Sequence, residues 1–102
     1  MTVKVIDQPE AHRYEATVDG QLEVAGFSQY IRTPELIAFL HTEVRPEFEG
    51  RGVGSALART SLDEARTAGL SVLATCPFYA AWIGRHPEYA DLLYQARSKV
   101  SD

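Results

Sequence analysis

Alternating hydrophobic and polar residues in the first half of the chain predict an antiparallel sheet. From His12 to Val18 the alternation is strict, which is typical of a strand with one buried face. Asp19-Gly20 follows and favours a tight hairpin turn, because both residues tolerate a positive φ. We expect further strands at about Gln21–Ile31, with Gly26 as a bulge, at Glu35–Val44, and at a short edge segment, Val3–Ile6.

The second half changes to a helix–strand–helix pattern. Pro46 ends the third main strand, and a helix is expected from about Val53 to Ala68, with Gly69 as its C-cap. Leu70–Thr75 is almost entirely apolar, as expected of a strand covered on both faces. We then expect a second helix from Pro77, an interruption at Pro87, a last helical piece at about Glu88–Ala96, and a polar tail from about residue 97. This order predicts an α+β fold in one domain that covers residues 1–102.

Composition narrows the classes of partner. The 102 residues include 10 basic and 14 acidic side chains, a net charge of −4, which argues against general binding to nucleic acid. A single cysteine permits neither an internal disulfide nor a multi-cysteine metal site, so a reducing cytoplasm is the expected location. No apolar run suits a membrane span or a signal peptide, and His12 and His86 have no metal-ligand neighbours. We therefore expect neither a membrane, a metal nor a nucleic acid as partner.

The loop before the first helix has the pattern of an anion site. Gly50-Arg51-Gly52-Val53-Gly54 places three glycines at alternate positions between a strand and a helix. Such a bare backbone lets successive N–H groups converge on an anion, and the helix N-terminus adds about half a positive charge. The same glycines would equally serve a tight turn and close packing. The spacing matches neither the P-loop nor the dinucleotide-binding fingerprint.

The chain resembles the GNAT superfamily of acetyl-CoA-dependent N-acetyltransferases, and most closely its members of about 100 residues. The resemblance lies in HTEVRPEFEGRGVGSALARTSLDEARTAGL (41–70) and LATCPFYAAWIGRHPEY (73–89). The family's pyrophosphate loop, [QR]-x-x-G-x-[GA], falls on Glu49–Gly54 here, with Glu49 departing from the first position. The resemblance implies a GNAT-like fold whose third main strand and Leu70–Thr75 strand splay apart to admit the pantetheine arm of coenzyme A.

The same resemblance implies where the cofactor binds. The pyrophosphate would lie on the N–H groups from Arg51 to Gly54, joined by Ser55, and Val44 would donate its N–H to the thioester oxygen. Arg45, Arg51 and Arg85 are all candidates for the 3′-phosphate. The full expected set of cofactor-binding residues is Val44, Arg45, Glu49, Gly50, Arg51, Gly52, Val53, Gly54, Ser55, Cys76, Tyr79, Trp82 and Arg85. Phe78 and Trp82 would form the wall of the pantetheine slot or simply belong to the core.

Acetylation of an amine needs a base, because the amine must lose a proton before it attacks. On the Glu35–Val44 strand, one expected face carries Ile37, Phe39, His41 and Glu43, so it turns from apolar to ionisable next to the glycine loop. We expect Glu43 to be the general base, with His41 as its partner or substitute. The alternatives are a solvated carboxylate at a strand end and a hydrogen-bonded, half-buried histidine.

Two further candidates lie at the start of the second helix. Cys76 precedes Pro77 at a helix N-terminus, which can lower the pKa of a thiol, so it could be a nucleophile, a cofactor-lining residue or a packing residue. Tyr79 could protonate the leaving thiolate, or pack on the sheet with its hydroxyl in water.

These residues lead to an expected function. We expect an acyltransferase that moves acetyl from acetyl-CoA to a primary amine, either a small amine or a protein lysine, by direct attack, in a monomer or a homodimer. The main alternative is a non-catalytic acyl-CoA-binding or sensing module, because no helix pair fits between His12 and Glu35 to cover the acceptor site. A structural interaction domain that uses an exposed sheet edge is a third reading.

Overall fold

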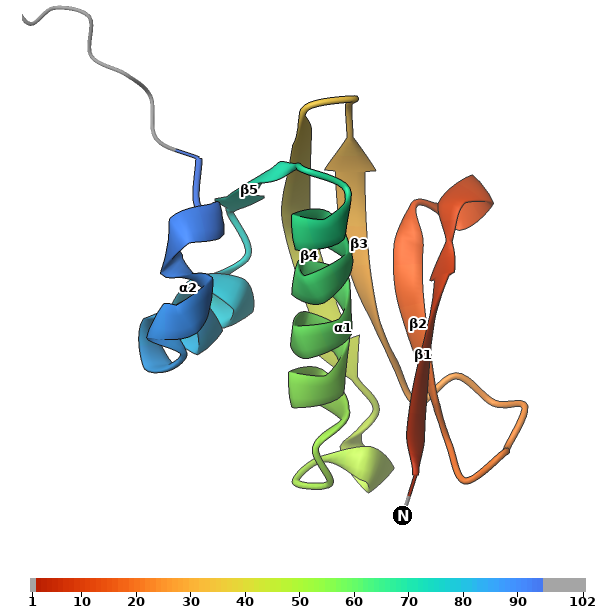
Figure 1. Ribbon diagram of the computed structural model, residues 1–102. Coiled ribbons are helices and arrows are strands. Elements are labelled where there is room, and N and C mark those ends of the chain that lie inside the picture. The colour runs from red at the N-terminus through yellow and green to blue at the C-terminus, as the bar shows by residue number, and fades with distance from the viewer. Residues whose placement is uncertain (1, 95–102) are drawn as a thin grey trace, which may run out of the picture.

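A computed structural model describes residues 2–94 as a five-stranded sheet with its helices on one side (Figure 1). The strands are β1 (Val3–Gln8), β2 (Arg13–Val18), β3 (Gly26–Arg32), β4 (Leu36–Val44) and β5 (Ser71–Ala74). The helices are α1 (Val53–Thr67) and α2 (Pro77–Arg85), with short 3-10 turns η1 (Pro9–Ala11), η2 (Pro46–Phe48) and η3 (Pro87–Leu92). The polar tail and the end of the expected last helix lie outside the described residues.

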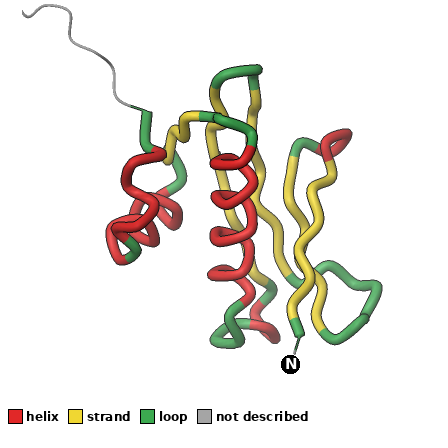
Figure 2. Tube along the Cα trace, viewed as in Figure 1, coloured by secondary structure: helices red, strands yellow, loops and turns green. Residues whose placement is uncertain are grey.

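The sheet follows chain order, β1-β2-β3-β4-β5, with antiparallel pairs up to β4 and a parallel β4–β5 pair joined through α1 (Figure 2). This arrangement confirms the expected α+β class and the antiparallel meander. β5 pairs only with Leu36–Phe39, and the Cys76 N–H then bonds to the Phe39 carbonyl at 2.9 Å before the chain turns into α2. β4 therefore continues past β5 with one unpaired edge, which confirms the expected separation of the two strands.

Helix α1 begins and ends where the glycines predicted. Gly52 takes a φ of +83° as its N-cap, and Gly69 takes +73° after its last turn. The Leu70 N–H then bonds to the Ala65 carbonyl and the Gly69 N–H to the Arg66 carbonyl, the paired bonds of a Schellman motif. The buried face of α1 lies against the sheet and consists of Val53, Leu57, Ala58, Ser61, Leu62 and Ala65.

Three expectations about the strands are wrong. Asp19 and Gly20 take positive φ and the Gln21 N–H bonds to the Val18 carbonyl at 3.0 Å, so the tight turn forms. The residues that follow it do not pair with β2 as expected, and β3 starts only at Gly26. Gly26 is no bulge; a Cβ there would meet the Glu43 carbonyl at 2.8 Å, so it is a point of close approach. β5 is an edge strand, and only its Val72 is fully buried.

Of the differences from the predicted strands, a bulge in β4 changes the candidate site most. Tyr30 pairs with Phe39 and Gln29 with His41, so Leu40 is an extra residue in β4. Before the bulge Ile37 and Phe39 face the core, whereas after it Thr42 and Val44 are the half-buried positions and His41 and Glu43 are exposed. The prediction that His41 and Glu43 share a face with Phe39 is therefore wrong, because one inserted residue inverts the alternation.

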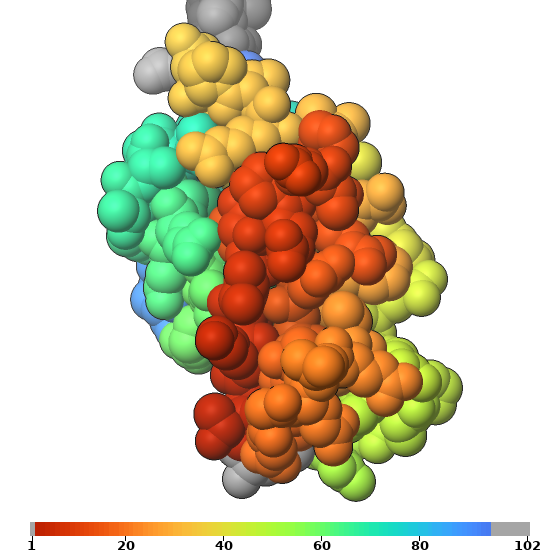
Figure 3. Space-filling model, turned by 90° about the vertical axis from the view of Figure 1, so that its right-hand side faces the viewer, coloured from red at the N-terminus to blue at the C-terminus, as the bar shows by residue number. Residues whose placement is uncertain are grey.

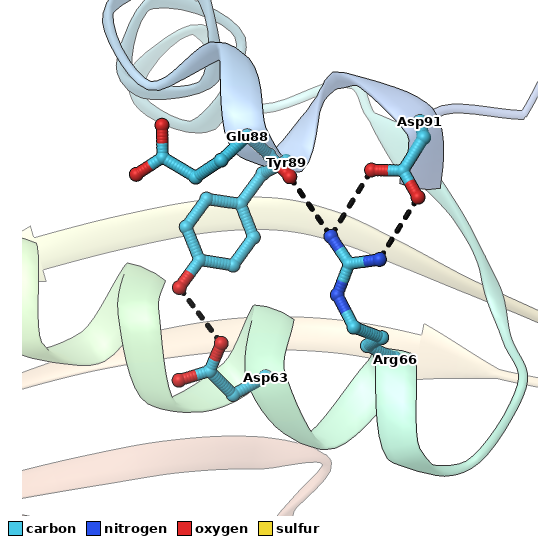
Figure 4. Close-up of polar contacts among 5 residues, drawn as sticks. All are labelled: Asp63, Arg66, Glu88, Tyr89 and Asp91. Carbon is cyan, nitrogen blue, oxygen red and sulfur yellow. Dashed lines mark hydrogen bonds and ion pairs between the residues drawn. The ribbon is translucent and has the colours of Figure 1, made fainter.

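Polar side chains attach η3 to α1 (Figure 4). Arg66 donates to both carboxylate oxygens of Asp91, at 2.8 and 3.0 Å, and to the Glu88 carbonyl at 2.9 Å. The buried Tyr89 donates its hydroxyl to Asp63 at 2.7 Å. These bonds hold η3, and with it the end of α2, against α1.

No helix within residues 2–94 has the length and apolar character required to span a bilayer.

Candidate active site

The glycine loop forms a cradle of free amides at the start of α1. Gly50 and Gly52 take φ values of +77° and +83°, which an L side chain would strain. The nearest loop bonds, from Phe48 to Arg45 and from Glu49 to Pro46, end just before the cradle. The first bond of α1 runs from the Ala56 N–H to the Gly52 carbonyl, and Gly52 offers no side-chain cap. Within the described part of the chain, the N–H groups of residues 50–55 therefore have no protein acceptor.

A cavity of about 280 Å³ opens on this cradle. Gly54 forms its narrow floor, since a Cβ there would lie 3.1 Å from the Phe78 ring. The cavity is lined by Val44, Phe48, Glu49, Gly50, Gly52, Val53, Gly54, Ser55, Phe78, Trp82 and Arg85. Nine of these are expected cofactor-binding residues, whereas Arg45, Arg51, Cys76 and Tyr79 lie outside the cavity.

Sequence reasoning missed two of the lining residues as part of the site. Phe48 was not predicted to line the site, although an apolar residue directly before a glycine loop can indicate a residue that lines a binding cavity. Sequence reasoning left Phe78 between core and cofactor wall; the structure shows Phe78 half-buried, while Tyr79, Trp82 and Ile83 form the buried face of α2.

The loop amides and the cavity next to them fit a diphosphate and part of the cofactor arm. Unpaired amides at a helix N-terminus favour an anion, and the positive φ of Gly50 and Gly52 leaves no side chain over them. Glu49 lines the same cavity, and its negative charge opposes an anion there. A volume near 280 Å³ holds the diphosphate and part of the arm, so the rest must extend along the open edge of β4.

The three candidate arginines differ in their surroundings. Arg45 forms ion pairs with Glu23 and with Glu47, the latter at 2.9 Å, and these carboxylates raise the pKa of its guanidinium. The Arg51 guanidinium lies 5.9 Å from the centre of the Phe48 ring. Arg85 lines the cavity and has no ion pair with any residue from 2 to 94. Arg85 is therefore the arginine best placed to meet an anion at the cavity.

Backbone amides also point into the gap between β4 and β5. The Arg45 N–H bonds to Ala25 at 2.8 Å on the β3 side. Because neighbouring residues of a strand alternate, the N–H of Val44 points to the opposite edge, beyond the end of β5. Val44 also lines the cavity, so its N–H lies at the end of the route that a cofactor arm would follow.

His41 and Glu43 lie together on the outer face of the sheet. The His41 Nε2 is 2.8 Å from a Glu43 carboxylate oxygen, and the two side chains are 54% and 62% exposed. The Phe27 ring, 6.1 Å away between centroids, flanks the imidazole. The pair is thus formed in advance and open to an acceptor that approaches from the face without helices.

Cys76 and Tyr79 are buried behind the gap. The Cys76 thiol lies 3.5 Å from the Thr42 hydroxyl, whose oxygen is 3.2 Å from that of Ser28. The Tyr79 ring stacks on Phe39 at 4.1 Å, and its hydroxyl lies 2.8 Å from the Ser61 hydroxyl. Burial raises the pKa of Tyr79 to about 12. The expectation that this hydroxyl would lie in water if the ring packs on the sheet is wrong.

Trp82 contributes an edge of its ring system to the cavity. Its indole N–H donates to the Ser55 hydroxyl at 2.8 Å, and its ring stacks on His86 at 3.7 Å. The side chain is almost fully buried, so it fixes the spacing between α1 and α2 and offers no open ring face.

Comparisons with known proteins identify the family of the chain. A family model described as GCN5-related N-acetyl-transferase matches residues 13–92. A comparison with the curated proteins finds no match.

Solved structures of similar fold carry related descriptions. The solution structure of a GCN5-like protein from Staphylococcus aureus superposes with a TM-score of 0.67 at 21% identity, covering 96% of this chain and 94% of the other. A ribosomal-protein-alanine N-acetyltransferase from Brucella melitensis biovar Abortus 2308 gives 0.56 at 21% identity, covering 88% and 67%. At these identities the structural likeness establishes the fold, and the family model spans most of the chain. The protein therefore belongs to the GCN5-related N-acetyl-transferase family.

Proposed function

We propose that the protein transfers the acetyl group of acetyl-CoA to a primary amine by direct attack of the amine on the thioester. The observation that carries the proposal is the cradle of unpaired N–H groups at residues 50–55, which opens on a cavity beside the unpaired edge of β4. Family membership supports acyl transfer, and the cradle supports coenzyme A as the carrier.

In the proposed mechanism the chain binds the diphosphate with its loop amides and the 3′-phosphate with Arg85. Acetyl-CoA supplies an activated acyl group. The Val44 N–H donates to the thioester oxygen, where negative charge develops as the amine attacks. The C–N bond forms, the C–S bond breaks, and the sulfur leaves with the electron pair.

Glu43 takes the amine proton, directly or through a water, and His41 holds its carboxylate in place. Both side chains are on the outer face, from which an amine can reach the gap between β4 and β5. General base catalysis of this kind contributes about 10²–10⁴-fold to a rate.

We propose packing roles for Cys76 and Tyr79. A tyrosine with a pKa of about 12 is a weaker acid than a free thiol, whose pKa is near ~8.5, so proton transfer from Tyr79 to a thiolate is uphill. The Cys76 thiol is buried against Thr42 and packs beside the route of the cofactor arm. The cytoplasmic location and the oligomeric state stay predictions.

Isothermal titration with acetyl-CoA, followed by a thiol-release assay with primary amines, tests the proposal. We expect saturable binding below millimolar and amine-dependent release of coenzyme A. R85Q should weaken binding about tenfold, because it removes a charge-assisted bond, whereas R45Q should change it little, because Arg45 is already paired with two glutamates.

Absence of saturable binding would remove the basis of the proposal. Binding without amine-dependent release of coenzyme A would instead favour the acyl-CoA-binding module. A loss of acetyl-CoA affinity in R45Q as large as that in R85Q would assign the 3′-phosphate to Arg45.

A further inference from the structure

The gap between β4 and β5 is closed at one end. Residues 36–39 of β4 pair with β5, and the Phe39 carbonyl then accepts two further bonds, from the Thr75 hydroxyl at 2.7 Å and from the Cys76 N–H at 2.9 Å. Beyond these bonds β4 continues with one unpaired edge to Val44, which lines the cavity at the glycine loop. The gap therefore runs from an open end at the cradle to a closed end at Cys76.

Two side chains meet across the closed end. Cys76 is 3% exposed, and its sulfur lies 3.5 Å from the hydroxyl oxygen of the half-buried Thr42. The residues behind this contact are tightly packed. The Thr42 hydroxyl oxygen is 3.2 Å from that of the fully buried Ser28, and the Tyr79 ring stacks on Phe39 at 4.1 Å. Cys76 and Thr42 therefore have little freedom to move apart.

The length of β4 between the cradle and this contact limits what fits there. The N–H groups of Thr42 and Val44 both point to the gap, because the Arg45 N–H bonds to Ala25 on the β3 side and neighbouring residues of a strand alternate. Two residues of a strand span about 7 Å. The Thr42 and Cys76 side chains occupy part of that length, so the closed end leaves room for a short group only.

The planar carbon of a thioester fixes the direction of its acyl chain in this gap. In the proposed reaction the sulfur lies toward the cradle, from which the cofactor arm enters, and the oxygen faces the Val44 N–H. Figure 3, which looks onto the β1 edge, shows α1 on one side of the sheet and the strands open on the other, from which an amine reaches Glu43. The closed end is the remaining direction in the plane, and there the acyl chain meets Cys76 and Thr42.

We propose, resting on the proposed function, that Cys76 and Thr42 form a stop that limits the transferred acyl group to two carbons. A longer acyl chain must separate the thiol from the Thr42 hydroxyl or shift the residues packed behind them, and overpacking of this kind is costly in a dense interior. The two residues therefore determine acyl specificity and take no part in the chemical step.

Calorimetric titration with acetyl-CoA, propionyl-CoA and butyryl-CoA tests the stop without relying on turnover. The unmodified protein should bind butyryl-CoA at least tenfold more weakly than acetyl-CoA, with propionyl-CoA between them. Cys76→Ala removes the sulfur and should reduce the ratio of acetyl-CoA affinity to butyryl-CoA affinity at least fivefold. Ser61→Ala is the matched control and should keep the ratio, because it also removes one buried heavy atom, but on α1, where that atom contacts the Tyr79 hydroxyl.

Two further measurements address the same contact. Thr42→Ser keeps the hydroxyl and removes one methyl group, so it should reduce the affinity ratio about fourfold, the effect of one buried methylene. Amide NMR then locates the acyl group, because the Thr42 and Cys76 amides should shift between the coenzyme A and acetyl-CoA complexes. The Gly52 amide should be the same in both complexes, since it lies at the diphosphate.

A ratio near one in the unmodified protein, a ratio unchanged in both variants, or identical Thr42 and Cys76 shifts in the two complexes would overturn the stop. Equal acylation of an amine from all three thioesters would do so while the proposed function stands. Binding without amine-dependent release of coenzyme A would contradict the proposed transfer, and the affinity ratio would still decide on the stop. If no thioester binds, both proposals fall.

Discussion

At the scale of single residues, the proposed base Glu43 and its partner His41 show what one inserted residue can change. The i, i+2 spacing of His41 and Glu43 placed them on one face of a strand, and their hydrogen bond at 2.8 Å is consistent with that spacing. The choice of face depended on Leu40, because the bulge there separates the pair from Phe39. The change matters chemically, since it moves the pair from the core side to the open side.

Glu43→Gln should lower kcat/KM for an amine by about 100-fold, because a general base provides about 10²–10⁴-fold. Affinity for acetyl-CoA should stay within about twofold, since Glu43 does not line the cradle cavity. Steady-state kinetics across pH and calorimetry measure the two effects. Glu47→Gln, an exposed carboxylate next to the cradle, is the control; rates equal to those of the unmodified protein at every pH would exclude Glu43 as the base.

Tyr79→Phe separates packing from acid catalysis. It should reduce kcat by less than about threefold, because the buried hydroxyl bonds to Ser61 and its pKa of about 12 makes it a poor acid for a thiolate. It should cost about 1 kcal/mol of stability, the usual net contribution of one buried hydrogen bond, measured by urea unfolding. A fall of 100-fold or more in kcat, with unchanged affinity for the cofactor, would support Tyr79 as the acid that protonates the leaving thiolate.

At the scale of elements, helix termini were predictable because glycine and proline restrict the backbone locally. Pro77 begins α2, His86 and Pro87 end it, and Gly52 and Gly69 bracket α1. The start of β3 was not predictable in the same way. Strand pairing depends on partners distant in sequence, and here β1 pairs with β2 as far as Val3 and Val18, while β3 joins β2 only at Ala16.

Gly52→Val should weaken acetyl-CoA binding at least tenfold. A β-branched residue at a φ of +83° costs about 1–2 kcal/mol, and relief of that strain turns the loop amides away from their common centre. Gly69→Val is the matched control, with a φ of +73° and the same free space around its Cβ, but at the other end of α1. Gly69→Val should lower stability by a similar amount and leave the affinity for acetyl-CoA unchanged. Equal losses of affinity in both variants would contradict binding of the diphosphate by the loop amides.

At the scale of the whole molecule, tyrosine hydroxyls connect elements that lie far apart in the chain. Tyr14 of β2 donates to Glu64 of α1 at 2.8 Å, Tyr30 of β3 to Asp7 of β1 at 2.6 Å, and Tyr89 of η3 to Asp63 of α1 at 2.7 Å. Burial, followed by the hydrogen bond to a carboxylate, raises the pKa of each of these tyrosines above its ordinary value of 10. The folded state therefore keeps protons that the unfolded state releases at alkaline pH.

Stability should fall as pH rises through about 10 and beyond, because there the unfolded state binds fewer protons than the folded state. Below the unfolded-state pKa the contribution of these hydroxyls is fully present. Urea unfolding between about pH 8 and 11 measures the decline, and Tyr14→Phe should make it less steep. Tyr94→Phe, at an exposed ring, is the control; a midpoint independent of pH over this range would contradict the prediction.

The sequence by itself determined the features that depend on neighbouring residues. These are the α+β order, the limits of α1 and α2, and the glycine loop that joins β4 to α1. Local backbone restrictions and periodicity are sufficient for them, because each involves residues within a few positions of one another.

Only the tertiary structure decided which residues of the candidate site lie together. The bulge at Leu40 depends on pairing with β3, the charge pairing of Arg45 depends on Glu23 and Glu47, and the burial of Tyr79 depends on Phe39 and Ser61. These contacts join separate elements, and the pattern within any one element carries no information about its partner's register or charge.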